Sequence, residues 1–376
     1  MESLDCTFPV EGLFRAAGGN TPARLLDLSR NGKMTGNDIL IPLSLVQKLR
    51  LRTGQYISGE AANAGNPNQR RLVRINAIDG LPIDRRRFCM PFQRATTTSP
   101  EKMFHLETGT APLSTRIIDF FVPIGRGQRC MIVAPPKTGK TILLQQIARG
   151  ILQNHGDCHL MVLLVDERPE EVTDFKRNAP VEIFASSNDE AIKTHIEVAQ
   201  LAFARAENLV ETGRHVVLLL DSLTRLARAI NNNLGRGAGR TMTGGLDPQA
   251  LERARQFFSL ARNTEEIGSL TIIATALIET GSRMDEAIFQ ELKGTGNCEI
   301  ILDRKLAERR IFPAINIPAS STRREELLLG AKELQLNQLL RRSFVGLSPE
   351  DAMEGLVNRL SKTASNREFM DFIAKR

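Results

Sequence analysis

Apolar residues in the second part of the chain form short continuous runs, separated by stretches with helical spacing. Continuous apolar runs are typical of parallel strands covered on both faces, because neither side meets water. One long stretch repeats its apolar positions at spacings of three and four, which predicts a helix with one buried stripe. The members of this stripe are Ile192, Ile196, Ala199, Phe203, Ala206 and Val210. The runs that we predict as strands are Cys130–Ala134, Leu160–Val165, His215–Leu220, Leu270–Ala276 and Cys298–Leu302. Alternation of strand and helix predicts an α/β fold with a doubly wound parallel sheet.

The first part of the chain has a different pattern. Short β segments at Asp38–Ile41, Tyr56–Ser58 and Leu72–Ile75 are separated by turn residues, which favours a small β-barrel. We therefore expect a barrel over residues 1–90, a connector over 91–112 and a larger α/β domain over 113–376. The end of that domain has helical spacing, with a helix start predicted at Ser348-Pro349-Glu350-Asp351.

Composition narrows the class of protein. The chain has 376 residues, 41% of them hydrophobic, which suffices for two domains with cores of their own. Its longest apolar runs, such as Met161–Val165, are far shorter than the ~20 residues of a membrane span. The first residues lack the pattern of a signal peptide. The five cysteines are scattered, and His155 and His159 have no third ligand nearby. We expect a soluble cytoplasmic protein with reduced thiols and no zinc site.

The charge of the chain is mildly basic, at a formal +7. Seven arginines lie between Asn66 and Ala95, opposed only by Asp79 and Asp84. They are Arg70, Arg71, Arg74, Arg85, Arg86, Arg87 and Arg94. Composition leaves two interpretations open for this segment: a solvated basic linker or a surface that faces phosphates.

A phosphate-binding loop follows the first strand of the α/β part. Ala134-Pro-Pro-Lys-Thr-Gly139-Lys140-Thr141 fits the phosphate-loop pattern, with Ala in place of its first Gly, and a helical stretch, Ile142–Leu152, comes next. In this context backbone N–H groups surround the β-phosphate of a nucleotide. Lys140 would neutralise the β- and γ-phosphates, and the Thr141 hydroxyl would bind Mg²⁺.

Two acidic residues follow neighbouring predicted strands. Asp221 ends the run His215–Leu220, where a carboxylate faces the crevice in which such sheets bind ligands, so it is the candidate for holding Mg²⁺ through a water. Glu167 lies just past Leu160–Val165 and is the candidate for polarising the attacking water. Hydrolysis also needs positive charge near the γ-phosphate. Arg310 and Arg323 are candidates that could act on a neighbouring subunit, and spacing alone does not choose between them.

These residues belong to a larger set that resembles the Rho family of bacterial transcription terminators. The set covers about Leu113 to Leu328 and comprises the phosphate loop, Ile124-Gly-Arg-Gly-Gln-Arg129, Leu164-Val-Asp-Glu-Arg-Pro-Glu-Glu-Val172, Asp221-Ser-Leu-Thr-Arg-Leu-Ala-Arg-Ala229, Thr243-Gly-Gly-Leu-Asp247, Ser269-Leu-Thr-Ile-Ile-Ala-Thr-Ala-Leu277, Lys293-Gly-Thr-Gly-Asn297 and Thr322-Arg-Arg-Glu-Glu-Leu327. The resemblance implies a RecA-like ATPase that forms a homohexamer, translocates on single-stranded RNA as a helicase, and releases nascent RNA from RNA polymerase in the bacterial cytoplasm. Its implied cofactors are ATP and Mg²⁺.

The resemblance also implies roles for individual residues. Lys140, Thr141, Asp221 and Glu167 keep the roles given above, Arg323 becomes the arginine finger, and Arg310 a second inter-subunit arginine. Further nucleotide contacts are implied for Gly125, Arg126, Gly127, Gln128, Arg129, Cys130, Lys137, Thr138, Gly139, Ile142, Arg168 and Phe312, the last by stacking on the base. Channel loops that grip RNA are implied to contain Arg240, Thr243, Gly281, Ser282 and Arg283.

The first ~90 residues match this family only in part. They keep the outline of its OB-type barrel, but Glu11 and Leu13 stand where the family has stacking aromatics, and Leu40 and Gln69 where it has tyrosines. The family's N-terminal helical segment is also expected to be absent. Arg15, Arg70 and Arg71 remain as candidate RNA contacts. We therefore expect weak RNA binding by the barrel, without cytosine preference. Two other functions stay open: an RNA-remodelling paralogue without a termination role, and a regulatory RNA-binding ring.

Overall fold

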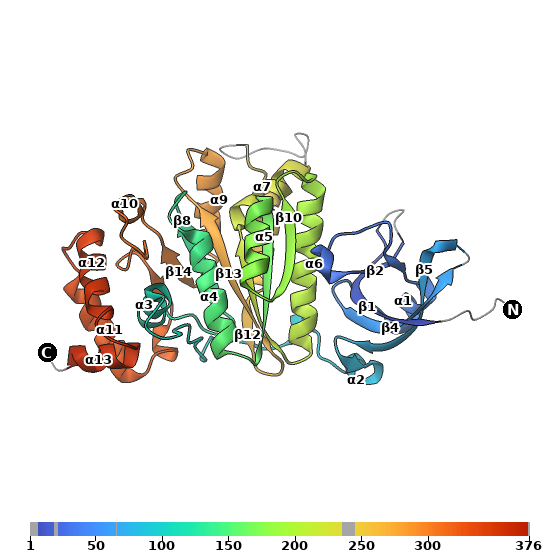
Figure 1. Cartoon of the computed structure of the whole chain (residues 1–376), viewed down its shortest axis with the longest axis horizontal. Coiled ribbons are helices and arrows are strands. Elements are labelled where there is room, and N and C mark those ends of the chain that lie inside the picture. Colours follow the sequence, from blue (N-terminus) through green and yellow to red (C-terminus); the bar gives the residue numbers. More distant parts are fainter. Residues whose placement is uncertain (1–6, 19–21, 65, 235–244, 375–376) are drawn as a thin grey trace.

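The computed structural model describes residues 7–18, 22–64, 66–234 and 245–374. It runs from a β-barrel at one end, through a large sheet covered by helices, to a group of C-terminal helices (Figure 1). The structure confirms the predicted fold class, a small OB-like barrel followed by a RecA-like α/β unit. In the described part of the chain, no helix has the length and apolar character needed to cross a bilayer.

The strands of the N-terminal barrel pair antiparallel, with one parallel exception. They are β1 (Phe8–Arg15), β2 (Arg24–Leu26), β3 (Ile39–Leu40), β4 (Tyr56–Ala64), β5 (Asn66–Ile78) and β6 (Leu81–Pro82), and the short helices are η1 (Leu28–Arg30), α1 (Leu43–Leu49) and α2 (Ile83–Arg87). Strand order is β3-β2-β1-β4-β5-β6, and an additional parallel pairing between β3 and β5 closes the barrel. The predicted segments coincide with parts of β3, β4 and β5. Sequence reasoning missed β1, because Pro9 and Gly12 weaken its strand pattern.

The large sheet carries the strands expected from the apolar runs. Its strands are β7 (Thr97–Thr98), β8 (Arg129–Ala134), β9 (Cys158–Glu167), β10 (Glu182–Ser187), β11 (His215–Asp221), β12 (Arg262–Thr264), β13 (Ser269–Leu277), β14 (Cys298–Ile301) and β15 (Ser321–Thr322). The order is β10-β9-β11-β13-β8-β14-β15, with parallel pairing from β10 to β14. Parallel strands place their carboxyl ends at one edge of the sheet, where the site described below lies.

Helices cover both faces of this sheet. They are α3 (Leu113–Phe121), α4 (Lys140–Asn154), α5 (Pro169–Asn178), α6 (Ile192–Glu211), α7 (Leu223–Leu234), α8 (Pro248–Ser259), α9 (Arg283–Lys293), α10 (Arg304–Glu308), α11 (Ala331–Ser343), α12 (Pro349–Leu360) and α13 (Asn366–Ala374), with the short η2 (Phe92–Arg94) and η3 (Glu325–Leu327). One core joins α3, α4, α5 and the C-terminal helices to one face, and a second joins α6 to α9 to the other. The stripe of α6 is buried from Ile196 onward, and Ser348 caps α12 by accepting the N–H of Asp351, as predicted.

The barrel is held against α6 by a buried ionic network. Arg86 pairs with Asp79 and with Glu211 of α6, at 2.8 Å each, and Arg205 of α6 pairs with Asp79 at 2.9 Å. Gly54 touches the same helix so closely that an added Cβ would lie 2.5 Å from the Arg205 nitrogen. Part of the basic segment noted in the sequence therefore holds the barrel in place rather than facing solvent.

Candidate active site

The phosphate loop connects the carboxyl end of β8 to the start of α4. Gly139 precedes Lys140, the first residue of α4, with φ of +88°, a left-handed conformation that favours glycine. The Thr138 hydroxyl donates to the Pro135 carbonyl at 2.8 Å and stabilises the turn. The strand, loop and helix thus have the arrangement that presents backbone N–H groups to a phosphate.

Lys140 meets both predicted acids at this edge of the sheet. Its Nζ lies 2.7 Å from Asp221 Oδ2 at the end of β11, and 3.4 Å from Glu167 Oε1 at the end of β9. Thr275 of β13 donates its hydroxyl to Asp221 Oδ1 at 2.7 Å, which fixes that carboxylate. The structure thus brings together three residues that lie far apart in the sequence.

Burial and mutual charge set the protonation of this cluster. Burial raises the pKa of Glu167 to about 7, and the neighbouring Asp221 charge adds to this, against the opposing Lys140 and Arg225. Burial also works against the Lys140 ammonium, but Asp221 and Glu167 outweigh it, and its pKa lies above the ordinary value. Glu167 therefore titrates near neutral pH, where a general base is effective.

Arg225 is a member of this cluster that sequence reasoning missed. It lies in the first turn of α7, its Nη1 donates to the Asp166 carbonyl, and its Nη2 lies 3.5 Å from Glu167 Oε2. That Glu167 oxygen has no hydrogen-bond partner within the described residues. The available signal was the position of Arg225 shortly after Asp221, because a helix that starts beside a catalytic strand end points its first side chains into the crevice.

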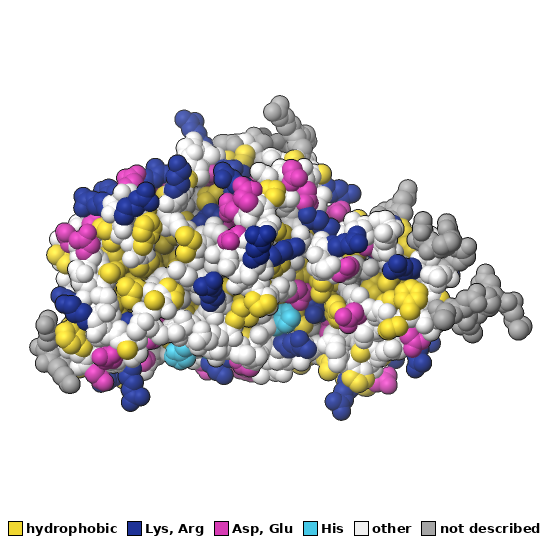
Figure 2. Space-filling model, viewed as in Figure 1, with side chains coloured by type: hydrophobic (Ala, Val, Ile, Leu, Met, Phe, Trp, Pro, Cys, Tyr) yellow, Lys and Arg dark blue, Asp and Glu magenta, His cyan; other side chains and the backbone are white. Residues whose placement is uncertain are grey.

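An apolar cavity of about 350 Å³ opens beside the loop. Its lining joins Thr138, Gly139 and Ile142 of the loop and α4 to Phe312, together with Pro112 and Leu113 before and in α3. Figure 2 shows hydrophobic side chains gathered on this face between α10 and α4. An aromatic ring among apolar neighbours, next to a phosphate-binding loop, suits a nucleotide base. Arg168, at the start of α5, is exposed beyond Glu167.

Arg310 lies near the phosphate loop of its own chain. It lines a cavity of about 600 Å³ together with Lys137 of the loop and Arg304. The segment after α10 thus places Arg310 beside the loop of its own chain, and its role as a second inter-subunit arginine stays a prediction.

Residues Gly125–Cys130, which are predicted to contact the nucleotide, do not flank the loop of their own chain. They lead into the amino end of β8, whereas the loop follows its carboxyl end. Arg126 is buried and paired with Asp157 at 2.8 Å, and Cys130 is buried beside Cys298, so these two side chains face no nucleotide. The reason is the length of β8, which separates the two motifs across the sheet.

The same residues instead lie next to Arg323. Asn297 accepts the Arg129 N–H at 2.8 Å through its side chain, and its carbonyl accepts the Arg323 N–H at 2.9 Å. Burial lowers the pKa of Arg129, and the charges of Arg262 and Arg323 lower it further. Arg323 itself is exposed. The predicted nucleotide residues thus fall into two groups, one around Lys140 and one around Arg323.

Comparisons with known proteins identify the family. A sequence profile described as the nucleotide-binding domain of the ATP synthase alpha/beta family matches residues 114–322. The transcription termination factor Rho of Cereibacter sphaeroides is 48% identical over 340 residues, which make up 89% of this chain and 80% of that protein. The chain belongs to the Rho family. The resemblance seen in the sequence motifs is thereby confirmed.

Other members of the Rho family are longer. The Rho protein of Streptomyces lividans is 48% identical over 343 residues, 90% of this chain but 48% of that protein, so the chain spans about half the length of this relative. A solved structure titled as a prototypical ATPase from the type III secretion system of pathogenic bacteria aligns with a TM-score of 0.60 at 24% identity, covering 74% of this chain and 86% of that one. This likeness shows the fold alone.

The predicted RNA contacts have mixed positions. Gly281, Ser282 and Arg283 form the start of α9, where Ser282 accepts the Asp285 N–H and Arg283 is exposed. Arg240 and Thr243 lie outside the described residues. Arg70 and Arg71 are exposed on β5, but Arg15 pairs with Glu197 of α6 at 3.0 Å. Arg15 therefore has an acidic partner within the chain, and its contact with RNA stays a prediction.

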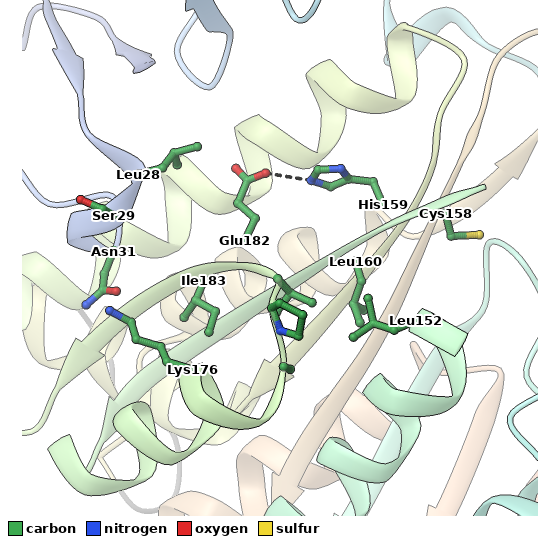
Figure 3. Close-up of a pocket in the computed structure, with 13 residues that line it drawn as sticks. Leu28, Ser29, Asn31, Leu152, Cys158, His159, Leu160, Lys176, Glu182 and Ile183 are labelled. Carbon is green, nitrogen blue, oxygen red and sulfur yellow. Dashed lines mark hydrogen bonds and ion pairs between the residues drawn. The ribbon is translucent and has the colours of Figure 1, made fainter. Parts of the chain in front are cut away.

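Another cavity, of about 480 Å³, lies between the barrel and the sheet (Figure 3). Leu28, Ser29 and Asn31 line it from the barrel side, and His159 and Glu182, 2.8 Å apart, line it together from the side of the sheet. None of the predicted site residues lines it. His155 instead bonds with the backbone of His105, so the two histidines noted in the sequence have separate partners.

Proposed function

We propose that the chain is an RNA-dependent ATPase of the bacterial cytoplasm that translocates on nascent RNA and releases it from RNA polymerase. The observation that supports this most directly is the cluster of Lys140, Glu167 and Asp221 at the carboxyl edge of the sheet, with an apolar base cavity beside it. The names of the relatives, transcription termination factor Rho, supply the termination part of the proposal.

Each residue of the cluster has a distinct task in ATP hydrolysis. Lys140 leaves its carboxylate partners to bind the β- and γ-phosphates, and Phe312 stacks on the base. Glu167, with a pKa of about 7, accepts a proton from the attacking water. Arg225, already 3.5 Å from Glu167, holds that carboxylate in position. Arg310 and Lys137 add positive charge on the outer side of the loop.

The residues present fit a Mg²⁺ ion. This ion prefers oxygen ligands, and the Thr141 hydroxyl and the Asp221 carboxylate supply them at the loop, the latter through a water. Glu167 Oε2 accepts no hydrogen bond within the described residues, which leaves acceptor capacity in the cluster. When bound, Mg²⁺ neutralises charge on the β- and γ-phosphates.

The separation of the nucleotide residues into two groups supports a ring. Arg323 and the backbone of Gly125, Gly127 and Gln128 cannot serve the loop of their own chain, but each could serve the loop of an adjacent copy. We infer that ATP lies between subunits of a homohexamer, with Arg323 as the arginine finger. A closed head-to-tail ring repeats one such interface at every boundary.

RNA is proposed to pass through the centre of this ring. Gly281, Ser282 and Arg283, with Arg240 and Thr243, suit a grip on the sugar–phosphate backbone. In the barrel, Leu13 is fully buried and cannot stack on a base, while Arg70 and Arg71 are available to phosphates. We therefore expect weak, salt-sensitive binding without cytosine preference. Filter binding of poly-C against poly-A tests this, and tight C-selective binding at moderate salt would contradict it.

ATP turnover with and without RNA tests the central proposal. We expect stimulation by RNA in the wild type and loss of turnover in Glu167→Gln. An RNA-remodelling paralogue would share both results but would fail to release RNA from a stalled polymerase. The absence of the barrel aromatics favours this second candidate function. A regulatory ring would show no turnover in either protein.

A further inference from the structure

Phe88 is the most exposed large hydrophobic side chain of the described residues, at 89%. It directly follows α2, and its N–H donates to the Arg85 carbonyl at 3.1 Å, so the backbone beneath it is ordered by the helix. A partner that covers this ring removes apolar surface from water, which is favourable. Helix α2 lies at the lower edge of the barrel in Figure 1, away from the phosphate loop.

Four cations lie on α2, which precedes Phe88, and at the adjoining end of α1. Arg85 and Arg87 belong to α2, while Lys48 and Arg50 come from the end of α1. Arg87 donates to the Lys48 carbonyl at 3.3 Å, which joins the two helix ends. None of the four has an ion-pair partner in the part of the chain that the structure describes. We call Lys48, Arg50, Arg85, Arg87 and Phe88 the α2 surface.

A cavity of about 620 Å³ adjoins the α2 surface. Its lining includes Lys48, Arg50 and Arg87, together with the exposed Arg52 and the buried Arg86, which both pair with Glu211. Arg52 and Arg86 hold the barrel against α6 through Glu211, so Lys48, Arg50 and Arg87 remain available. Asp84 is the exposed acid of α2 and leaves the surface with a net positive charge.

The combination of features selects one class of ligand. Cations alone suit any polyanion, but an exposed ring among them also suits a flat base. Single-stranded nucleic acid presents phosphates and unstacked bases side by side, whereas a duplex or an acidic peptide offers no base face. The barrel positions Glu11, Leu13, Leu40 and Gln69 provide no aromatic ring, so Phe88 supplies a stacking group at a different place.

We propose that the α2 surface binds a short segment of single-stranded RNA, with one base on the Phe88 ring and adjacent phosphates on Lys48, Arg50, Arg85 and Arg87. The choice of RNA rests on the proposed function. The site is separate from the channel loops and from Arg70 and Arg71 on β5.

Cross-linking on the full chain tests the location. An oligouridylate of about 12 nucleotides, within the range of OB-fold site sizes, carries 5-iodouridine and is irradiated with the protein. We expect a cross-link on the tryptic peptide Phe88–Arg94, lost in Phe88→Ala and kept in Phe88→Trp. Phe92 in the same peptide is fully buried and cannot react. Cross-links elsewhere but none on this peptide would overturn the α2 surface alone; no RNA binding at all would overturn the proposed function with it.

Fluorescence anisotropy without ATP measures the contribution to affinity. Phe88→Ala should weaken binding about fivefold or more, the loss of one stacked base. Arg85→Ala with Arg87→Ala should lower the slope of log K against log salt by about 1.4, since each single-strand phosphate contact contributes roughly 0.7. The matched controls are Val345→Ala and the pair Arg342→Ala with Arg359→Ala, exposed on the C-terminal helices. Equal affinity of Phe88→Ala and its control would refute base stacking.

Discussion

The Lys140 ammonium lies 2.7 Å from Oδ2 of Asp221, two residues that 81 positions separate in the chain. The lysine that is proposed to bind phosphate is thus held by the carboxylate that is proposed to hold the metal. Entry of a triphosphate with Mg²⁺ exchanges one set of ionic partners for another, so the buried charges remain compensated throughout.

Replacing Lys140 should abolish both nucleotide binding and turnover. Lys140→Met removes the phosphate contact and leaves Asp221 and Glu167 buried without this cation, which raises the pKa of Glu167 further. Binding of a fluorescent ATP analogue measures the first effect and phosphate release the second. Lys137→Met, outside the carboxylate cluster, is the control and should retain part of the binding.

Glu167→Gln should lower kcat by about 10²–10⁴-fold with little change in nucleotide affinity, because the amide keeps the shape but accepts no proton. In the wild type, kcat should rise with pH and level off above about pH 7, the pKa of Glu167. Glu170→Gln, in the exposed first turn of α5, should leave kcat and its dependence on pH unchanged. A kcat that stays constant between about pH 6 and pH 8, on either side of that pKa, would argue against Glu167 as the base.

Arg323→Ala should bind nucleotide normally and hydrolyse it about 10³-fold more slowly or worse, as expected for an arginine finger. Mixed rings give a sharper result. A subunit with Arg323→Ala has an intact Glu167, and a subunit with Glu167→Gln has an intact Arg323. In a mixed ring, a boundary that combines the Glu167 of the first with the Arg323 of the second therefore has both residues. Turnover should therefore partly recover on mixing; no recovery would show that Arg323 serves its own chain.

Arg86→Ala should destabilise the protein by about 3–5 kcal/mol, because it removes the buried cation shared by Asp79 and Glu211, which keep only Arg205 and Arg52 as partners. Arg86 is 5% exposed and bonded to both carboxylates, which favours its charged form. Urea denaturation measures the free energy of unfolding. Arg85→Ala, one residue away and exposed, is the control and should change that energy little.

Asp119 should make stability depend on pH. Burial raises its pKa to about 8, against the N–H groups of Leu106 and Glu107 that favour the carboxylate. Its folded pKa exceeds the unfolded value of about 3.9, so the stabilisation present at acid pH is lost as the pH rises from about 4 to 8. As the pH rises over this window, the free energy of unfolding of the wild type should therefore fall relative to that of Asp119→Asn. If the two free energies depend on pH in the same way, the raised pKa of Asp119 is contradicted.

The sequence by itself determined the β-barrel, the parallel sheet and the elements of the nucleotide site. Continuous apolar runs identify strands covered on both faces, and the carboxyl ends of parallel strands share one edge, so Lys140, Glu167 and Asp221 could be placed together before any coordinates. The missed β1 and Arg225 show the limit of such patterns: Pro9 and Gly12 obscure a strand, and a helical arginine has many possible partners.

Only the tertiary structure decided which residues contact one another across the sheet. The order β9-β11-β13-β8 places Thr275 against Asp221, and the length of β8 carries Gly125–Arg129 to the edge opposite the loop, beside Arg323. Likewise, the docking of the barrel on α6 pairs Arg15 with Glu197, while Phe88 stays in solvent. Such outcomes depend on strand order and on domain docking, which arise from contacts between distant segments and leave no local pattern in the chain.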